Sequence, residues 1–312
     1  MKIISLLLAI FISSNCLASE AITAKPFKYP YPVMTFDLPV SKNGIGYRLY
    51  VRPPLRHPAE GQKSSSFYFL DALKNFTAAA VMSDNYETLG YTPSAYFIGI
   101  GYQNEADGIA KEANRTRDYT PTSFTPPDEK HYLAGNPVDY VNSGGADAFL
   151  DVIENQIIPF IESRFEVSKT DRVLIGKSMS GLAVVHAVLS KPELFNRNLI
   201  ISPSIWWDDW LYPRHQRYVM KQADKNKTSK QKSETRVYFA VGDDEERMGL
   251  VTDVYVLANA LRNRRDDNLK VYVDLLRGEQ HEGIFPAGYM RGIVGLYQDD
   301  KTTRNYASEV SW

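Results

Sequence analysis

The chain has 312 residues, of which 44% are hydrophobic, 12% aromatic and 23% charged, and its formal net charge is −1. This composition is enough for a large buried core, and the balanced charge gives no electrostatic reason to expect nucleic acid or an anionic membrane as a partner. The expected partner is therefore a small-molecule substrate.

The N-terminus has the pattern of a signal peptide. Lys2 precedes the apolar run IISLLLAIFI, and small residues at Cys16 and Ala18 suit signal-peptidase cleavage. The run is shorter than the roughly 20 residues that a spanning helix needs. We therefore expect residues 1–18 to be removed and the domain 19–312 to be periplasmic or secreted, with no membrane contact. Cleavage removes the single cysteine, which excludes disulfides, thiol catalysis and cysteine-ligated metals.

The rest of the chain alternates strand-like and helical segments, the pattern of an α/β fold. Eight strands are expected, within residues 33–40, 45–54, 65–70, 95–102, 172–176, 198–202, 236–242 and 269–276. The last six are almost continuously apolar, as in strands covered on both faces. Residues 148–165 have Phe149, Ile153, Ile157 and Ile161 at helical spacing, which predicts a helix packed on the sheet. Residues 221–235 are polar and charge-rich, as in a solvated insertion.

The stretch VLIGKSMSGL, residues 173–182, contains the candidate nucleophile. A nucleophile elbow needs a serine on a sharp turn between a strand and a helix, with small residues two positions to either side. Gly176 and Ser180 are those neighbours of Ser178, with serine in place of the second usual glycine. An apolar strand pattern precedes Ser178 and a helical pattern follows it, so the context favours a nucleophile over a hydroxyl in an ordinary turn.

A serine nucleophile needs a histidine within hydrogen-bond reach. His57 and His131 lie in loop-like segments, His215 lies in the polar insertion, and His186 is expected to pack along the helix after the elbow. His281 follows the last expected strand, and the chain order of serine, acid and histidine is that of α/β-hydrolases. The acid is expected after the strand 236–242, where Asp243, Asp244 and Glu245 are alternatives.

These segments resemble the α/β-hydrolase family known as Putative esterase. The likeness extends over residues 30–300 through SFYFLDALKNF, YFIGIGY, RDYTPTS, RVLIGKSMSGLAVVHAVLSKPELFNRNLIISPSIWW, YFAVGDDEE and GEQHEGIFP. The family includes siderophore trilactone esterases, feruloyl esterases, S-formylglutathione hydrolases and mycolyltransferases. The segments SPSIWW and GEQHEGIFP are most similar to the periplasmic siderophore esterases. The resemblance implies an α/β-hydrolase fold, with a mostly parallel central sheet, helices on both faces and a small helical insertion after the sixth strand.

The resemblance also implies roles for individual residues. The acid in such enzymes commonly stands three residues after the glycine that ends its strand, which points to Glu245, with Asp244 as the alternative. One oxyanion-hole donor is the backbone N–H of Met179, at a helix N-terminus that favours negative charge. The second is the N–H of Leu73, in a pattern where alanine at position 72 replaces the family's glycine.

The substrate is less well defined by the sequence. Trp206 and Trp207 follow the sixth strand and form either an aromatic wall for an aryl-bearing ester or a core cluster. Arg117, in a segment expected to be a loop, either holds an anionic group of the substrate or braces the loop. The expected function is serine ester hydrolysis on a siderophore-type or aryl ester, with no metal or organic cofactor. The alternatives are acyl transfer by the same residues and a binding protein without turnover.

Overall fold

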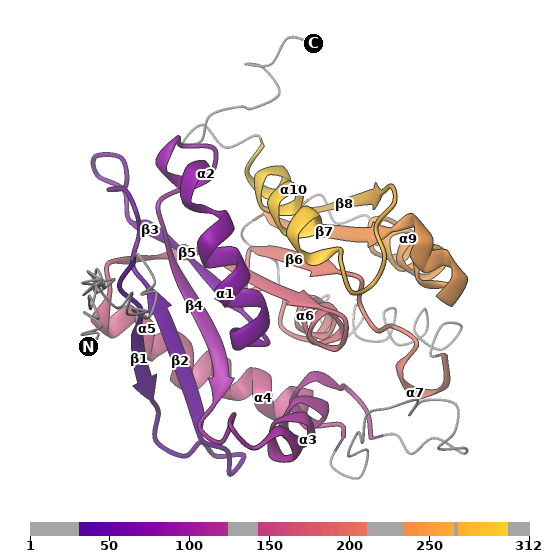
Figure 1. The fold of residues 1–312 in the computed structure, drawn as a ribbon, viewed down its shortest axis with the longest axis horizontal. Helices are drawn as coiled ribbons and strands as arrows, with labels where there is room; N and C mark the ends of the chain where they lie inside the picture. The colour runs from indigo at the N-terminus through magenta and orange to yellow at the C-terminus, as the bar shows by residue number, and fades with distance from the viewer. Residues whose placement is uncertain (1–30, 124–142, 211–233, 265–267, 299–312) are drawn as a thin grey trace, which may run out of the picture. The chain divides into compact units, whose positions relative to one another are not determined.

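The computed structural model describes residues 31–123, 143–210, 234–264 and 268–298. From Pro32 onward the chain forms one compact unit. Its centre is an eight-stranded sheet with the strand order β1-β2-β4-β3-β5-β6-β7-β8 (Figure 1). The strands are β1 (Met34–Asp37), β2 (Tyr47–Arg52), β3 (Ser64–Phe69), β4 (Ala95–Tyr102), β5 (Val167–Lys177), β6 (Arg197–Ile201), β7 (Thr235–Gly242) and β8 (Leu269–Leu276). Each of the eight segments expected from the sequence overlaps one of these strands, although β5 begins five residues before its expected segment.

The sheet is mostly parallel, which confirms the expected fold class. The pairs β1–β2 and β2–β4 are antiparallel, and every pairing from β4 through β3 to β8 is parallel. All residues of β3 and β6 are buried, as expected for strands covered on both faces. The same expectation is wrong for β8, which is only half-buried because it forms the edge of the sheet.

Helices cover both faces of the sheet. On one face, α1 (Ala72–Met82) and α10 (Phe285–Tyr297) lie against each other (Figure 1). Glycines in α10 leave room there for Leu199 and Ile201 of β6. Because side chains alternate along a strand, Ile200 points to the other face. There it belongs to a core cluster with residues of α4 (Ala146–Val152), α6 (Met179–Ser190) and α9 (Leu250–Arg262).

The helical run expected over residues 148–165 is present but is not a uniform α-helix. It consists of α4, a π-helical turn η3 (Ile153–Ile157) and α5 (Ile158–Arg164). Pro159 has no N–H to donate to the preceding turn, which accounts for a local widening next to it. The apolar stripe is confirmed, because Phe149, Ile153, Ile157 and Ile161 are all buried.

The remaining described elements are α2 (Asp84–Thr88), α3 (Gly108–Tyr119), α7 (Trp207–Trp210) and the 3-10 helix η4 (Asp243–Met248). The short helix α7 begins the insertion after the sixth strand, most of which lies outside the described residues. The expected signal peptide also lies outside them, so its cleavage and the periplasmic or secreted location stay predictions. Across the described ranges, no helix combines the length and apolar character needed to cross a membrane.

Candidate active site

Ser178 stands at the sharp turn between β5 and α6. Its backbone has φ 61° and ψ −122°, an unusual conformation for a residue other than glycine. The Ser178 N–H donates to the carbonyl of Ile201, the last residue of β6, at 3.0 Å. The turn therefore lies at the carboxyl edge of the parallel strands, where open α/β sheets bind their ligands.

The small neighbours that the sequence pattern requires are needed for the close approach of strand and helix. A Cβ atom on Gly176 would lie 2.3 Å from the carbonyl oxygen of Ser180, which is closer than real contacts allow. Ser180, in place of the second usual glycine, has a positive role here. Its hydroxyl accepts from the N–H of Lys177 at 2.9 Å and donates to the carbonyl of Lys177 at 2.8 Å. These two bonds hold the end of β5 against the first turn of α6.

His281 lies between Ser178 and Glu245. Its Nε2 is 3.0 Å from Ser178 Oγ, and its Nδ1 is 2.6 Å from Glu245 Oε1. The Glu245 side chain is fully buried, whereas 23% of the His281 side chain is exposed. The three residues follow β5, β7 and β8, which belong to the parallel part of the sheet, so all three lie at the carboxyl ends of its strands. The structure thus joins the serine, histidine and acid by hydrogen bonds, while their catalytic roles stay predictions.

The three acids that sequence reasoning left open have three different environments. Asp243 accepts from the N–H of Gly278 at 2.8 Å and so holds the turn that leads to His281. Asp244 is half-exposed and lies 3.7 Å from Arg247, one helical turn away. Only Glu245, among these three, has a hydrogen bond to the imidazole. This geometry favours Glu245 over the alternative Asp244.

Glu245 is held as a carboxylate. Burial raises its pKa, but hydrogen bonds from His281, from the Ser202 hydroxyl and from the Gly242 N–H together outweigh burial and hold the pKa below its usual value. The Ser202 hydroxyl is 2.6 Å and the Gly242 nitrogen 2.8 Å from the same oxygen, Oε2. The charge needed to orient and stabilise an imidazolium is therefore present at neutral pH.

The two predicted oxyanion donors lie at the N-termini of two helices that follow neighbouring strands. Met179 opens α6, and Leu73 is the second residue of α1. Strands β3 and β5 are paired, and the N–H of Leu70 donates to the carbonyl of Ile175 at 3.0 Å. The first N–H groups of a helix have no acceptor within it, so both groups are available to a ligand. The use of these N–H groups as an oxyanion hole stays a prediction.

The turn before Leu73 forms without the family's glycine. Asp71 itself takes the left-handed conformation, with φ 54° and ψ 55°, and Ala72 is already the first helical residue. The Asp71 N–H donates to the Tyr119 hydroxyl at 3.0 Å. The guanidinium of Arg115 binds the Asp71 carboxylate in a bidentate manner, at 2.6 and 3.0 Å. Helix α3 therefore supports the turn from the side.

Of the two predicted substrate-binding tryptophans, one is a core residue. Trp207 is fully buried, and its indole N–H donates to the carbonyl of Thr122 at 3.2 Å. This packing corrects the aromatic-wall interpretation for Trp207, because a ring without exposed surface presents no face to a ligand. Trp206 is half-buried, and the two ring centroids are 6.3 Å apart. A substrate contact by Trp206 stays a prediction.

Arg117 lies on helix α3 and not in a loop, which corrects the sequence interpretation of this segment. Its Nε donates to Asp118 at 2.8 Å, and its NH1 donates to Asn114 at 2.9 Å. Asp118 is fully buried and also accepts from the Tyr47 hydroxyl at 2.7 Å. These contacts favour the bracing alternative for Arg117 over a substrate contact.

The other histidines are consistent with the roles expected for them where they are described. His186 on α6 is 2% exposed, and its Nε2 is 2.7 Å from Asp147, so it is a packed helix histidine as predicted. His57 is exposed. His131 and His215 lie outside the described residues.

Two serines of the site were not identified from the sequence. Ser202 and Ser204 follow β6 directly, and both are buried. The Ser204 hydroxyl lies 3.2 Å from Ser178 Oγ, and its N–H donates to the Ser178 carbonyl at 3.0 Å. Their position just after the strand next to the elbow strand was the available signal, because carboxyl ends of adjacent parallel strands meet at one edge.

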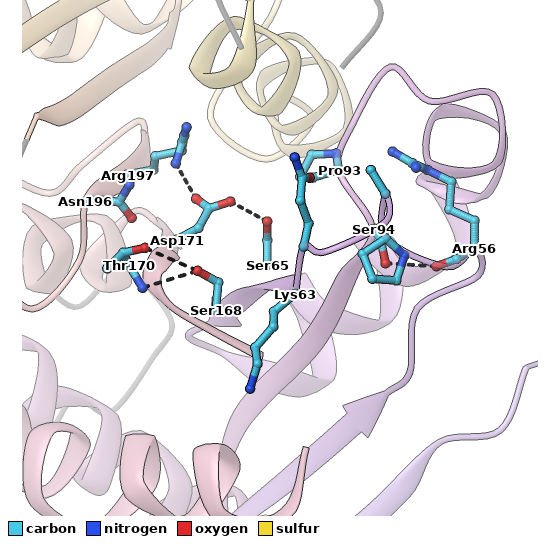
Figure 2. Close-up of a pocket in the computed structure, with 13 residues that line it drawn as sticks. Arg56, Lys63, Ser65, Pro93, Ser94, Ser168, Thr170, Asp171, Asn196 and Arg197 are labelled. Carbon is cyan, nitrogen blue, oxygen red and sulfur yellow. Dashed lines mark hydrogen bonds and ion pairs between the residues drawn. The ribbon is translucent and has the colours of Figure 1, made fainter. Parts of the chain in front are cut away.

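A cavity of about 440 Å³ lies away from Ser178, toward the amino ends of the parallel strands (Figure 2). Its lining includes Ser65 near the start of β3, Asp171 in the first part of β5 and Arg197 at the start of β6. Figure 2 shows Asp171 between Ser65 and Arg197, to both of which it is bonded. These three lining residues are thus paired with one another.

The described ranges contain no group of three or more histidine, cysteine or acidic side chains that could hold a metal.

The mostly parallel sheet with helices on both faces is the fold of an α/β-hydrolase. Residues 44–288 match the family described as Putative esterase, and the chain belongs to that family.

Two relatives are named as esterases, one of them as a siderophore esterase. Over 112 residues the chain is 44% identical to the siderophore triacetylfusarinine C esterase of Aspergillus fumigatus, a match that covers 36% of this chain and only 34% of that protein. Over 251 residues it is 27% identical to the ferri-bacillibactin esterase BesA of Bacillus subtilis, covering 77% of this chain and 79% of BesA.

Solved structures share the fold. The siderophore hydrolase EstA of Aspergillus nidulans is similar with a TM-score of 0.71 and 23% identity, over 89% of this chain and 100% of EstA. The BES protein of Bacillus cereus is similar with a TM-score of 0.71 and 23% identity, over 88% of this chain and 98% of that protein.

Proposed function

We propose that this protein is a serine ester hydrolase that works through an acyl-enzyme, outside the cytoplasm and after removal of residues 1–18. The observation that carries the proposal is the chain of hydrogen bonds from Ser178 Oγ through His281 to Glu245. Both contacts are within hydrogen-bond reach, so His281 can take the Ser178 proton and Glu245 can orient the imidazole. Membership of the esterase family supports the same reaction.

In the proposed first half-reaction, Ser178 Oγ attacks the ester carbonyl while His281 Nε2 takes the hydroxyl proton. Glu245 accepts a hydrogen bond from the Nδ1–H of His281 and stabilises the imidazolium. The N–H groups of Met179 and Leu73 bind the oxyanion of the tetrahedral intermediate. His281 then gives its proton to the departing alcohol, and Ser178 is left as an ester.

In the second half-reaction, His281 takes a proton from water, which attacks the acyl carbonyl. The second tetrahedral intermediate collapses when Ser178 Oγ leaves and recovers a proton from His281. The acid product departs and the free enzyme is restored. Every proton that moves in this cycle passes through His281, so the proposal includes no cofactor.

We propose a siderophore-type or aryl ester as the substrate. Two relatives of the chain are named as a siderophore triacetylfusarinine C esterase and a siderophore enterobactin esterase. Trp206 supports an aryl-bearing substrate because it is half-buried and stands two residues after Ser204, which contacts the nucleophile.

Ser178→Ala should lower kcat for p-nitrophenyl acetate by about a million-fold, the typical cost of losing a triad nucleophile. The melting temperature should change little, because the hydroxyl is not needed for packing. Hydrolysis assays measure kcat, and thermal unfolding measures the melting temperature. Activity within tenfold of the wild type would show that Ser178 is not the nucleophile.

Glu245→Gln should lower kcat by about a thousand- to ten-thousand-fold, because the amide neither holds the neutral imidazole in the Nδ1–H tautomer nor stabilises the imidazolium. Asp244→Asn is the matched control, since it removes a neighbouring charge at a half-exposed position. It should leave kcat within about twofold, as surface changes usually do. If the Asn variant loses activity and the Gln variant does not, Asp244 is the acid.

Trp206→Ala should lower kcat/KM for a catecholate trilactone by about three- to tenfold more than for p-nitrophenyl acetate, because ring stacking adds binding that a small acyl group cannot use. Trp207→Ala is the contrasting variant. It should lower the free energy of unfolding by about 3–5 kcal/mol, as for other buried large side chains. Equal losses of kcat/KM on both substrates for Trp206→Ala would remove the aryl-binding role.

A further inference from the structure

Ser202 has a backbone conformation that serine rarely adopts. It follows β6 directly and has φ 43°, in the left-handed region that favours glycine. Its N–H donates to the carbonyl of Ala240 on β7 at 2.8 Å, so the backbone is tied to the neighbouring strand. The residue is fully buried. Glycine would fit this backbone with less strain, so the presence of serine calls for a role of its side chain.

The Ser202 side chain has one hydrogen-bond partner of functional interest. Its hydroxyl donates to Glu245 Oε2 at 2.6 Å. The same oxygen accepts from the Gly242 N–H at 2.8 Å, and the other oxygen contacts His281 Nδ1. Gly242 lies three residues before Glu245 in the same turn, whereas Ser202 comes from the end of another strand. The Ser202 contact therefore fixes the carboxylate relative to the strand that adjoins the elbow strand.

We propose that Ser202 is a positioning residue for the acid of the triad, kept in a strained backbone conformation for its hydroxyl. The hydroxyl holds Oε2 so that Oε1 stays directed at His281 Nδ1. A glutamate side chain has three rotatable bonds, and the local bond to Gly242 leaves it freedom to turn away. The inference rests on the proposed function, because it assigns Ser202 an effect only through Glu245.

Ser202→Gly tests the inference, because it removes the hydroxyl and accommodates the positive φ. We expect kcat for p-nitrophenyl acetate to fall by about ten- to a hundredfold, the factor that one hydrogen bond to a charged group represents. KM should be unchanged, since Ser202 is expected not to touch the substrate. The melting temperature should change little, because relief of the strained backbone at φ 43° offsets the lost hydrogen bond. Ser83→Ala is the matched control for loss of a buried hydroxyl, since Ser83 bonds Tyr289 at 2.7 Å. It should lower the melting temperature and leave kcat unchanged.

A double-mutant cycle separates positioning from a general structural effect. In a Glu245→Ala background, Ser202→Gly should cause no further loss of kcat, because there is no carboxylate left to position. If the fold-losses of kcat in the two single variants multiply in the double variant, the inference is overturned. A wild-type kcat in Ser202→Gly alone would also overturn it. If the wild type hydrolyses no better than Ser178→Ala, the proposed function fails, and this inference fails with it.

Discussion

The close approach of β5 and α6 at the elbow is the constraint on which the rest of the site depends. Gly176 and Ser180 approach so closely that a single added carbon would clash with backbone. This contact holds Ser178 in a strained conformation and directs its hydroxyl out of the sheet edge. It also places the first N–H groups of α6 directly after Ser178, where the proposed reaction requires an oxyanion donor. The proposed nucleophile and one proposed oxyanion donor are thus fixed by the same few backbone contacts.

The loop that carries His281 is positioned by a second close approach. A Cβ on Gly242 would lie 2.1 Å from the carbonyl oxygen of Glu279, so the end of β7 and the loop after β8 meet through glycine. Asp243 adds a hydrogen bond to Gly278 in the same loop. The segment after β7 therefore supports the histidine in two ways. Asp243 holds its loop, and Glu245 holds its ring.

Features set by local pattern were predictable from the sequence, and those set by side-chain direction were not. The eight strands, the elbow and the position of His281 follow from apolar runs and their order. The choice among Asp243, Asp244 and Glu245 needed the η4 turn, which directs neighbouring acids to different partners. The burial of Trp207 and the contacts of Ser202 depend on which way a chain turns after β6 ends. Arg117 was expected in a loop because the residues of α3 are mostly polar and charged, a composition that loops share.

Covalent labelling tests the central claim, that Ser178 is a nucleophile activated by His281, most directly. The protein is treated with a fluorophosphonate, and the modified residue is located by mass spectrometry of its peptides. The account predicts one adduct, on Ser178, that is absent in Ser178→Ala and forms far more slowly in His281→Ala. An adduct on another residue such as Ser204, or equal labelling of the wild type and His281→Ala, would contradict it.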